Sequence, residues 1–154
     1  MQYKERRGGV SPPHHHPPRG QVPLTPSKSH PFLFYLKQKD PQNQKGFQKI
    51  IPPKDRFYAD PFIVGKESSY FVFIEEFVYS QNKGHISYLK INQNGEYSEP
   101  KKILERPYHL SYPFVFKFKN DYYMIPETSE NKSIELYRCV KFPDEWEFVK
   151  TLMK

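Results

Sequence analysis

The chain has 154 residues and carries 24 Lys plus Arg against 17 Asp plus Glu, a formal net charge of +7. No segment approaches the ~20 consecutive apolar residues of a transmembrane helix, so we expect no membrane span. Cys139 is the single cysteine, which excludes an intrachain disulfide and a cysteine-based zinc site.

The excess of positive charge lies in the first third of the chain. Residues 1–53 hold nine basic and two acidic side chains and 10 of the 16 prolines, whereas residues 54–154 hold 15 of each charge and 21 of the 26 aromatics. Because the body is neutral, we expect no nucleic-acid partner. The basic, Pro- and His-rich segment 1–30 predicts a disordered leader. His14–His16 can in principle ligate a metal, but a solvated run is the better interpretation, and we expect no metal or cofactor.

Residues 31–53 are interpreted as a clasp strand and a linker. Pro31–Lys37 is an apolar run that predicts one strand lying on a neighbouring sheet, and Asp40–Lys54 is predicted to be a loop. The leader lacks the apolar core of a secretory signal, which together with the single cysteine leads us to expect a cytoplasmic protein.

The segment 54–154 shows no helical periodicity and predicts an all-β fold. Short runs of β-branched and aromatic residues alternate with turn residues such as Asn94-Gly95, which is typical of an antiparallel meander. The predicted strands are Pro61–Val64, Tyr70–Phe77, His85–Ile91, Lys101–Leu104, Pro113–Lys119, Asp121–Ile125, Ser133–Val140 and Glu147–Leu152.

These strands form two copies of one pattern. The first two strands of each copy are related by an offset of 52 residues, and the third and fourth by 48, which predicts a shorter turn in the second copy. Four antiparallel strands repeated about every 50 residues are typical of a β-propeller blade, so we predict blades at about 57–106 and 108–154; two unrelated meanders of a sandwich are the alternative. Two blades do not close a propeller, so we expect further blades beyond the chain or a homo-oligomer.

The segment from Pro52 to Lys154 resembles a known family. The strings that carry the resemblance are Phe57-Tyr58-Ala59-Asp60-Pro61-Phe62, His109-Leu110-Ser111-Tyr112-Pro113 and Tyr123-Met124-Ile125-Pro126-Glu127-Thr128. They resemble the amino-terminal domain of glucosamine inositolphosphorylceramide transferases and its bacterial relatives. The resemblance implies a five-bladed propeller similar to glycoside hydrolase families 43 and 32. It also implies that sugar transfer resides in a separate domain, so no transferase activity is expected here.

The same resemblance, together with the acid–base chemistry of glycosidases, selects the candidate site residues. Asp60 matches the Asp-Pro general base of family-43 hydrolases, and Glu127 is the candidate general acid. Glu75, His109 and Tyr112 are candidate substrate-binding residues. The structural alternatives are a strand cap for Asp60, a blade-to-blade hydrogen bond for Glu127 and a structural imidazole for His109. Glu76 is predicted to lie on the surface.

Two functions follow as hypotheses. The first is a carbohydrate- or glycoconjugate-recognising propeller, inert as a catalyst in this form and an inverting glycosidase if a closed form is active. The alternative is a non-catalytic docking module for a sugar-transferring enzyme. Tyr112 stands where many hydrolases have a second acid, which favours the alternative.

Overall fold

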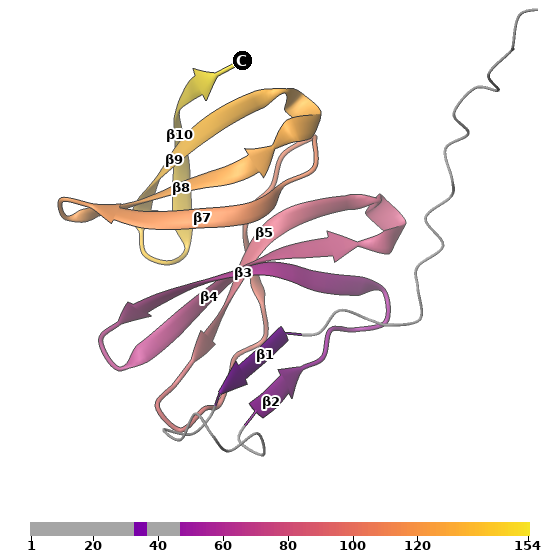
Figure 1. Cartoon of the computed structure of the whole chain (residues 1–154), viewed down its shortest axis with the longest axis vertical. Helices are drawn as coiled ribbons and strands as arrows, with labels where there is room; N and C mark the ends of the chain where they lie inside the picture. Colours follow the sequence, from indigo (N-terminus) through magenta and orange to yellow (C-terminus); the bar gives the residue numbers. More distant parts are fainter. Residues whose placement is uncertain (1–32, 37–46) are drawn as a thin grey trace, which may run out of the picture.

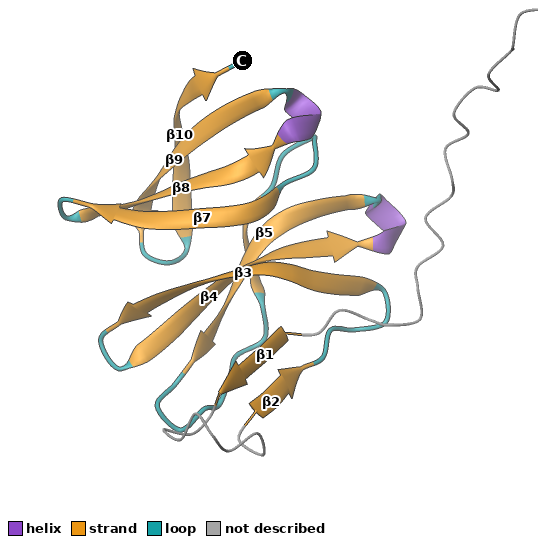
Figure 2. Ribbon diagram, in the orientation of Figure 1, coloured by secondary structure: helices purple, strands orange, loops and turns teal. Residues whose placement is uncertain are grey.

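The computed structural model describes residues 33–36 and 47–154, and it confirms the all-β prediction (Figures 1 and 2). The expected disordered leader, residues 1–30, lies outside the described residues. Within the described ranges, no helix is long and apolar enough to cross a bilayer. The strands are β1 Leu33–Leu36, β2 Phe47–Ile50, β3 Arg56–Lys66, β4 Ser69–Val78, β5 Lys83–Ile91, β6 Lys101–Leu104, β7 Ser111–Phe118, β8 Asp121–Thr128, β9 Ser133–Lys141 and β10 Glu145–Met153; the 3-10 turns are η2 Tyr79–Gln81 and η3 Ser129–Asn131.

In the described part of the chain, the strands form one hairpin and two four-stranded antiparallel sheets. The first sheet has the order β3-β4-β5-β6, the second has β7-β8-β9-β10, and β1 pairs with β2. In Figure 1 the two sheets lie face to face, with β3 of the first sheet next to β7 of the second and the β1–β2 hairpin on the other side of the first sheet. Each sheet is a meander, because every strand pairs with its neighbour in sequence.

The pairing registers explain the internal repeat. Ala59 pairs with Glu75 as Ser111 pairs with Glu127, which reproduces the offset of 52 residues. Glu75 then pairs with Ile86, and Glu127 with Ile134, so ten residues connect the first pair and six the second. The drop of four residues is therefore a shorter β8–β9 hairpin, as predicted.

The fourth strands depart from the predicted offset of 48. Leu104 pairs with Ile86, whereas Met153 rather than Leu152 pairs with Ile134, an offset of 49. The cause is a series of register shifts along β10, since each bulge adds a residue to one strand of the pair.

The space between the two sheets holds the larger apolar core. Phe73, Ile86, Leu110, Met124 and Tyr137 are fully buried there, and Trp146 packs edge-on against Phe73 with ring centroids 5.8 Å apart. Side chains alternate along a strand, so each sheet gives this core only one of its faces. The two sheets are consequently held together mainly by apolar burial.

The other face of the first sheet is covered as well. Ile50 of β2 packs in a second buried cluster with Tyr58, Val72, Ile74 and Leu89. The prediction of a loop over Asp40–Lys54 is therefore wrong at Phe47–Ile50, which forms β2. The apolar Ile50 side chain leaves water only if this segment pairs as a strand and lies against the sheet.

Phe114 and Phe116 of β7 do not face the core between the two sheets. Val115 is buried between the sheets, so its neighbours Phe114 and Phe116 lie on the opposite face of β7. Phe114 remains 43% exposed. The outer face of the second sheet thus carries apolar side chains that the described residues cover only in part; Phe114 itself meets Phe62 of the first sheet edge-on, with ring centroids 5.5 Å apart.

Phe73→Ala tests how much the inter-sheet core stabilises the fold. Removing a fully buried phenyl ring leaves a cavity, and we expect the free energy of unfolding to fall by about 3–5 kcal/mol, measured by urea titration. Ile63→Ala is the matched control, because Ile63 is largely exposed on β3 and its truncation is expected to cost little. Equal losses in the two variants would contradict this account.

Candidate functional site

Two equivalent bulges bring the innermost strands of both sheets together. Strand pairing is interrupted between Ala59 and Phe62 in β3 and between Ser111 and Phe114 in β7. Asp60 and Tyr112 lie in these bulges with φ of 48° and 42°, the left-handed region, and each precedes a proline. Such a backbone costs on the order of 1–3 kcal/mol for a non-glycine residue and often occurs at functional sites.

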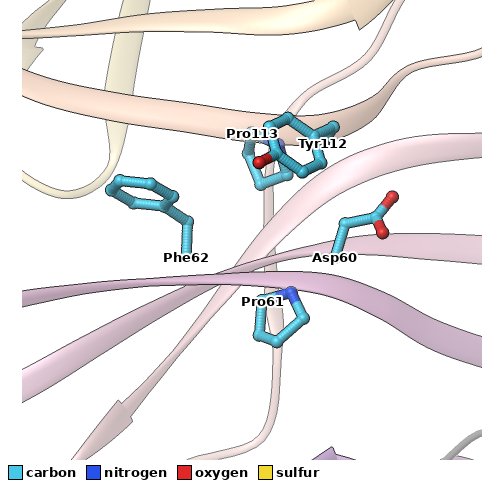
Figure 3. A pocket seen from close by; sticks show the side chains of 5 residues that line it. All are labelled: Asp60, Pro61, Phe62, Tyr112 and Pro113. Carbon is cyan, nitrogen blue, oxygen red and sulfur yellow. The ribbon is translucent and has the colours of Figure 1, made fainter.

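A small cavity lies between the bulges. It has a volume of about 250 Å³ and is lined by Asp60, Pro61, Phe62, Tyr112 and Pro113. Figure 3 shows Asp60 and Phe62 projecting from β3 toward Tyr112 and Pro113 of β7, with Pro61 on the other side of the strand. Tyr112 is 58% exposed, so its ring forms an accessible wall of the cavity. One carboxyl group beside two aromatic rings can bind a ligand that has both hydroxyls and an apolar face.

Glu75 of β4 pairs with Ala59, the residue before Asp60, and is only 6% exposed. Burial raises the pKa of its carboxyl to about 8, and the charge of Asp60, a hydrogen bond with Asp60 and the charge of Glu127 act in the same direction. At neutral pH the Glu75 carboxyl is therefore mostly protonated and can donate a hydrogen bond to Asp60. Two carboxyl groups of unequal protonation are a common basis of acid–base chemistry.

His109, in the loop before β7, lies between Gly84 of β5 and the Glu75 carboxyl. The backbone N–H of Gly84 donates to Nδ1 of His109 at 2.9 Å, and Nε2 lies 3.5 Å from Oε1 of Glu75. The backbone N–H of His109 donates to Oε2 of Glu130 at 2.6 Å, which fixes the loop before β7. His109 is held from both sides and does not line the cavity.

Glu127, the candidate general acid, is exposed on β8 and accepts a hydrogen bond from the Ser111 hydroxyl at 3.3 Å. Its charge acts on Glu75, but it does not line the cavity. The structure therefore brings the five predicted site residues into one region and places two of them, Asp60 and Tyr112, on the cavity wall. The catalytic and binding roles of all five remain predictions.

The expectation that Glu76 lies on the surface is wrong, because Glu76 is only 4% exposed. Its carboxylate accepts hydrogen bonds from Arg56 at 2.6 Å and from Ser87 at 2.6 Å, and His85 Nε2 lies 3.1 Å away. Burial alone would raise the pKa of Glu76, but the bonds from His85, Ser87 and Arg56 outweigh it and lower the pKa to about 2. Because side chains alternate along a strand, Glu76 lies on the opposite face of the first sheet from Glu75. The sequence did not show that this face is covered.

Sequence reasoning also missed Gly84, Phe62 and Pro113 as parts of the site region. Pro113 directly follows Tyr112, and Phe62 lies two residues after Asp60, so the repeated x-Pro-Phe string was the signal for them. No sequence signal identifies Gly84, because the loop that contains His109 approaches Gly84 only when the two sheets pack together. Among the residues that the structure describes, no group of three or more His, Cys, Asp or Glu side chains is placed to hold a metal ion.

Comparison with known proteins gives one family and three relatives. The family model described as "Glucosamine inositolphosphorylceramide transferase 1, N-terminal" matches residues 48–154. Proteins named glucosamine inositolphosphorylceramide transferase 1 are 39% identical over 98 residues in Oryza sativa (both subspecies) and 36% identical over 99 residues in Arabidopsis thaliana. These alignments cover 63% to 64% of this chain but only 13% of each relative. No solved structure matches the chain significantly.

Gly84→Ala tests the contact between the first sheet and the loop at His109. A Cβ at Gly84 would lie 2.7 Å from the Leu110 carbonyl oxygen and 2.8 Å from Cε1 of His109, closer than packed atoms can lie. We expect a loss of roughly 1–3 kcal/mol in the free energy of unfolding and a displaced His109 ring, detected by the histidine ring resonances in NMR spectra.

Gly65→Ala is the matched control, because a Cβ there would meet only the Tyr70 ring at an ordinary 3.8 Å. A Gly84→Ala variant as stable as the Gly65→Ala variant would show that the loop does not lie this close to β5.

Proposed function

The chain belongs to the family of glucosamine inositolphosphorylceramide transferase 1 N-terminal domains, and on this premise we propose that the cavity between β3 and β7 binds a saccharide or the sugar part of a glycoconjugate. The observation that carries the proposal is the cavity itself: a carboxyl group and two aromatic rings, supplied by equivalent bulges of two repeated sheets, around a volume of about 250 Å³. That volume is slightly below the ~300–1,000 Å³ of drug-sized sites and suits a ligand of about one ring.

The chemistry of the lining residues fits a sugar. The carboxylate of Asp60 accepts hydrogen bonds from vicinal hydroxyls, while Tyr112 and Phe62 offer aromatic faces to the C–H side of the ring. The printed name of the relatives begins with glucosamine, so glucosamine is the first sugar to test. In this proposal the two sheets are blades of a propeller, and the domain binds the sugar without catalysing a reaction on it.

Titration of the full chain with methyl glycosides of glucose, glucosamine, galactose and mannose tests this function. We expect binding of at least one glycoside, detected by isothermal titration calorimetry and by shifts of the Tyr112 resonances. Asp60→Asn removes the charge and keeps the shape, and we expect it to weaken binding about tenfold or more, since hydrogen bonds to charged groups are the stronger ones.

Asp121→Asn is the control, because Asp121 is exposed at the far end of the β7–β8 hairpin. No affinity for any of the four glycosides, or equal affinity in Asp60→Asn and the unsubstituted chain, would refute the saccharide site.

A second function, docking, is favoured by the outer face of the second sheet. Phe114, Phe118, Ile134 and Val140 are each more than two-fifths exposed on β7 and β9. The repeat relates Phe114 to Phe62 and Ile134 to Ile86, which on the first sheet pack against the second sheet. The partner that this face fits is accordingly another four-stranded unit of the same repeat, in a larger sugar-transferring protein.

Adding a third repeat tests the docking function. With residues 107–154 duplicated after Lys154, we expect the thermal midpoint to rise, because the outer face becomes buried. Ile134→Asp in the middle unit is expected to abolish the rise, whereas Ile63→Asp, at an exposed position of β3, leaves it intact. An unchanged midpoint, or association of the unmodified chain into a dimer through this face, would contradict the assignment.

A further inference from the structure

Four polar groups are arranged in a line from β5 toward the cavity, and one of them lines it. They are the backbone N–H of Gly84, the imidazole of His109, the carboxyl of Glu75 and the carboxyl of Asp60. Only Asp60 lines the cavity. Glu75 and His109 were predicted to bind substrate directly, and their positions behind Asp60 suggest a different role.

The hydrogen-bond directions along this line follow from the donors. Nδ1 of His109 accepts the Gly84 N–H, so the ring proton of the neutral imidazole is on Nε2, 3.5 Å from Oε1 of Glu75. A protonated Glu75 has one O–H to donate, and it pairs with Ala59, the residue directly before Asp60, so the Asp60 carboxylate is the neighbouring acceptor. Each group therefore points its proton toward the next, and the line ends on the Asp60 carboxylate.

We propose that Glu75 and His109 are positioning residues that orient the Asp60 carboxylate toward the cavity, and that saccharide affinity falls when Glu75 loses its proton. This inference rests on the proposed saccharide site. With one oxygen of Asp60 held by Glu75, the other stays free for the ligand. When Glu75 is ionised, two carboxylates face each other, the hydrogen bond between them is lost, and Asp60 is no longer fixed.

Three elements place ionisable groups near Glu75: Asp60 comes from β3, Glu127 from β8 and His109 from the loop before β7. On β5 its neighbours are Gly84 and Ile86, which carry no charge. Two of the three ionisable neighbours are acids, and the side chain is almost fully buried, so both burial and charge favour the protonated form. The pKa of about 8 places the change in the range between pH 7 and 9.

The first experiment needs no ligand. The carboxyl carbon resonances of Glu75 and Asp60 are followed by NMR against pH in the full chain, with assignments checked by Glu75→Gln and Asp60→Asn. We expect one transition near pH 8, seen at both residues. A Glu75 carboxyl that titrates near its ordinary value of 4.5 would overturn the inference whether or not a sugar binds.

The second experiment measures affinity for methyl glucoside, which has no ionisable group, between pH 6.5 and 9. We expect the unsubstituted chain to lose about fivefold in affinity over this range, as for the loss of one hydrogen bond. Glu75→Gln keeps an N–H donor toward Asp60 at every pH, so its affinity is expected to stay high and flat. Glu147→Gln, at an exposed ion pair with Arg138 on β10, is the control and is expected to follow the unsubstituted chain.

The two experiments separate the two proposals. A transition near pH 8 in the NMR titration without sugar binding at any pH refutes the saccharide site and with it the positioning role. Sugar binding that is equally steep in pH for Glu75→Gln and the unsubstituted chain refutes the positioning role alone, since a merely structural Glu75 would not set the pH profile.

Discussion

The close stacking of the two sheets is the constraint on which the rest of the structure depends. The inter-sheet core brings β5 so near the loop before β7 that the Gly84 carbonyl accepts the Leu110 N–H at 3.0 Å and its N–H reaches His109. The same stacking sets the bulges of β3 and β7 opposite each other. A hydrophobic interface with no chemistry of its own thereby positions every group of the candidate site.

Glu75 and Glu76 show how strongly position in such a stack controls a carboxyl group. They are adjacent and both buried, yet the pKa of Glu75 is raised to about 8 and that of Glu76 lowered to about 2. Burial acts in the same direction on both; the difference is that Glu76 has Arg56, His85 and Ser87 as donors, whereas the charges near Glu75 are those of the acids Asp60 and Glu127. The contribution of Glu76 to stability is thus present above pH 4.5 and lost as the pH falls through about 2, while that of Glu75 is present below pH 4.5 and lost as the pH rises through about 8.

Much of this arrangement was predictable from the sequence, because its signals are local or repeated. Strand alternation and turn residues indicate the meanders, and the offset of 52 residues by itself relates Asp60 to Tyr112. Non-local features were not predictable. Glu76 is buried because the face of the first sheet toward the β1–β2 hairpin is covered. Its charge is stabilised by Arg56, which is 20 residues away in the sequence. The role of Gly84 depends on a loop 25 residues further on.

The repeat also explains why equivalent residues behave differently. Glu75 and Glu127 occupy the same position of the two units and pair with Ala59 and Ser111, which are equivalent too. Glu75 faces a second sheet and is buried, while Glu127 faces the uncovered side of its own sheet and is exposed. The sequence sets the residue, but the neighbouring sheet sets its environment. A sheet that covered Phe114 and Ile134 would surround Glu127 as the second sheet surrounds Glu75, so the proposed docking face and the proposed sugar site would be parts of one stacking pattern rather than competing uses of the domain.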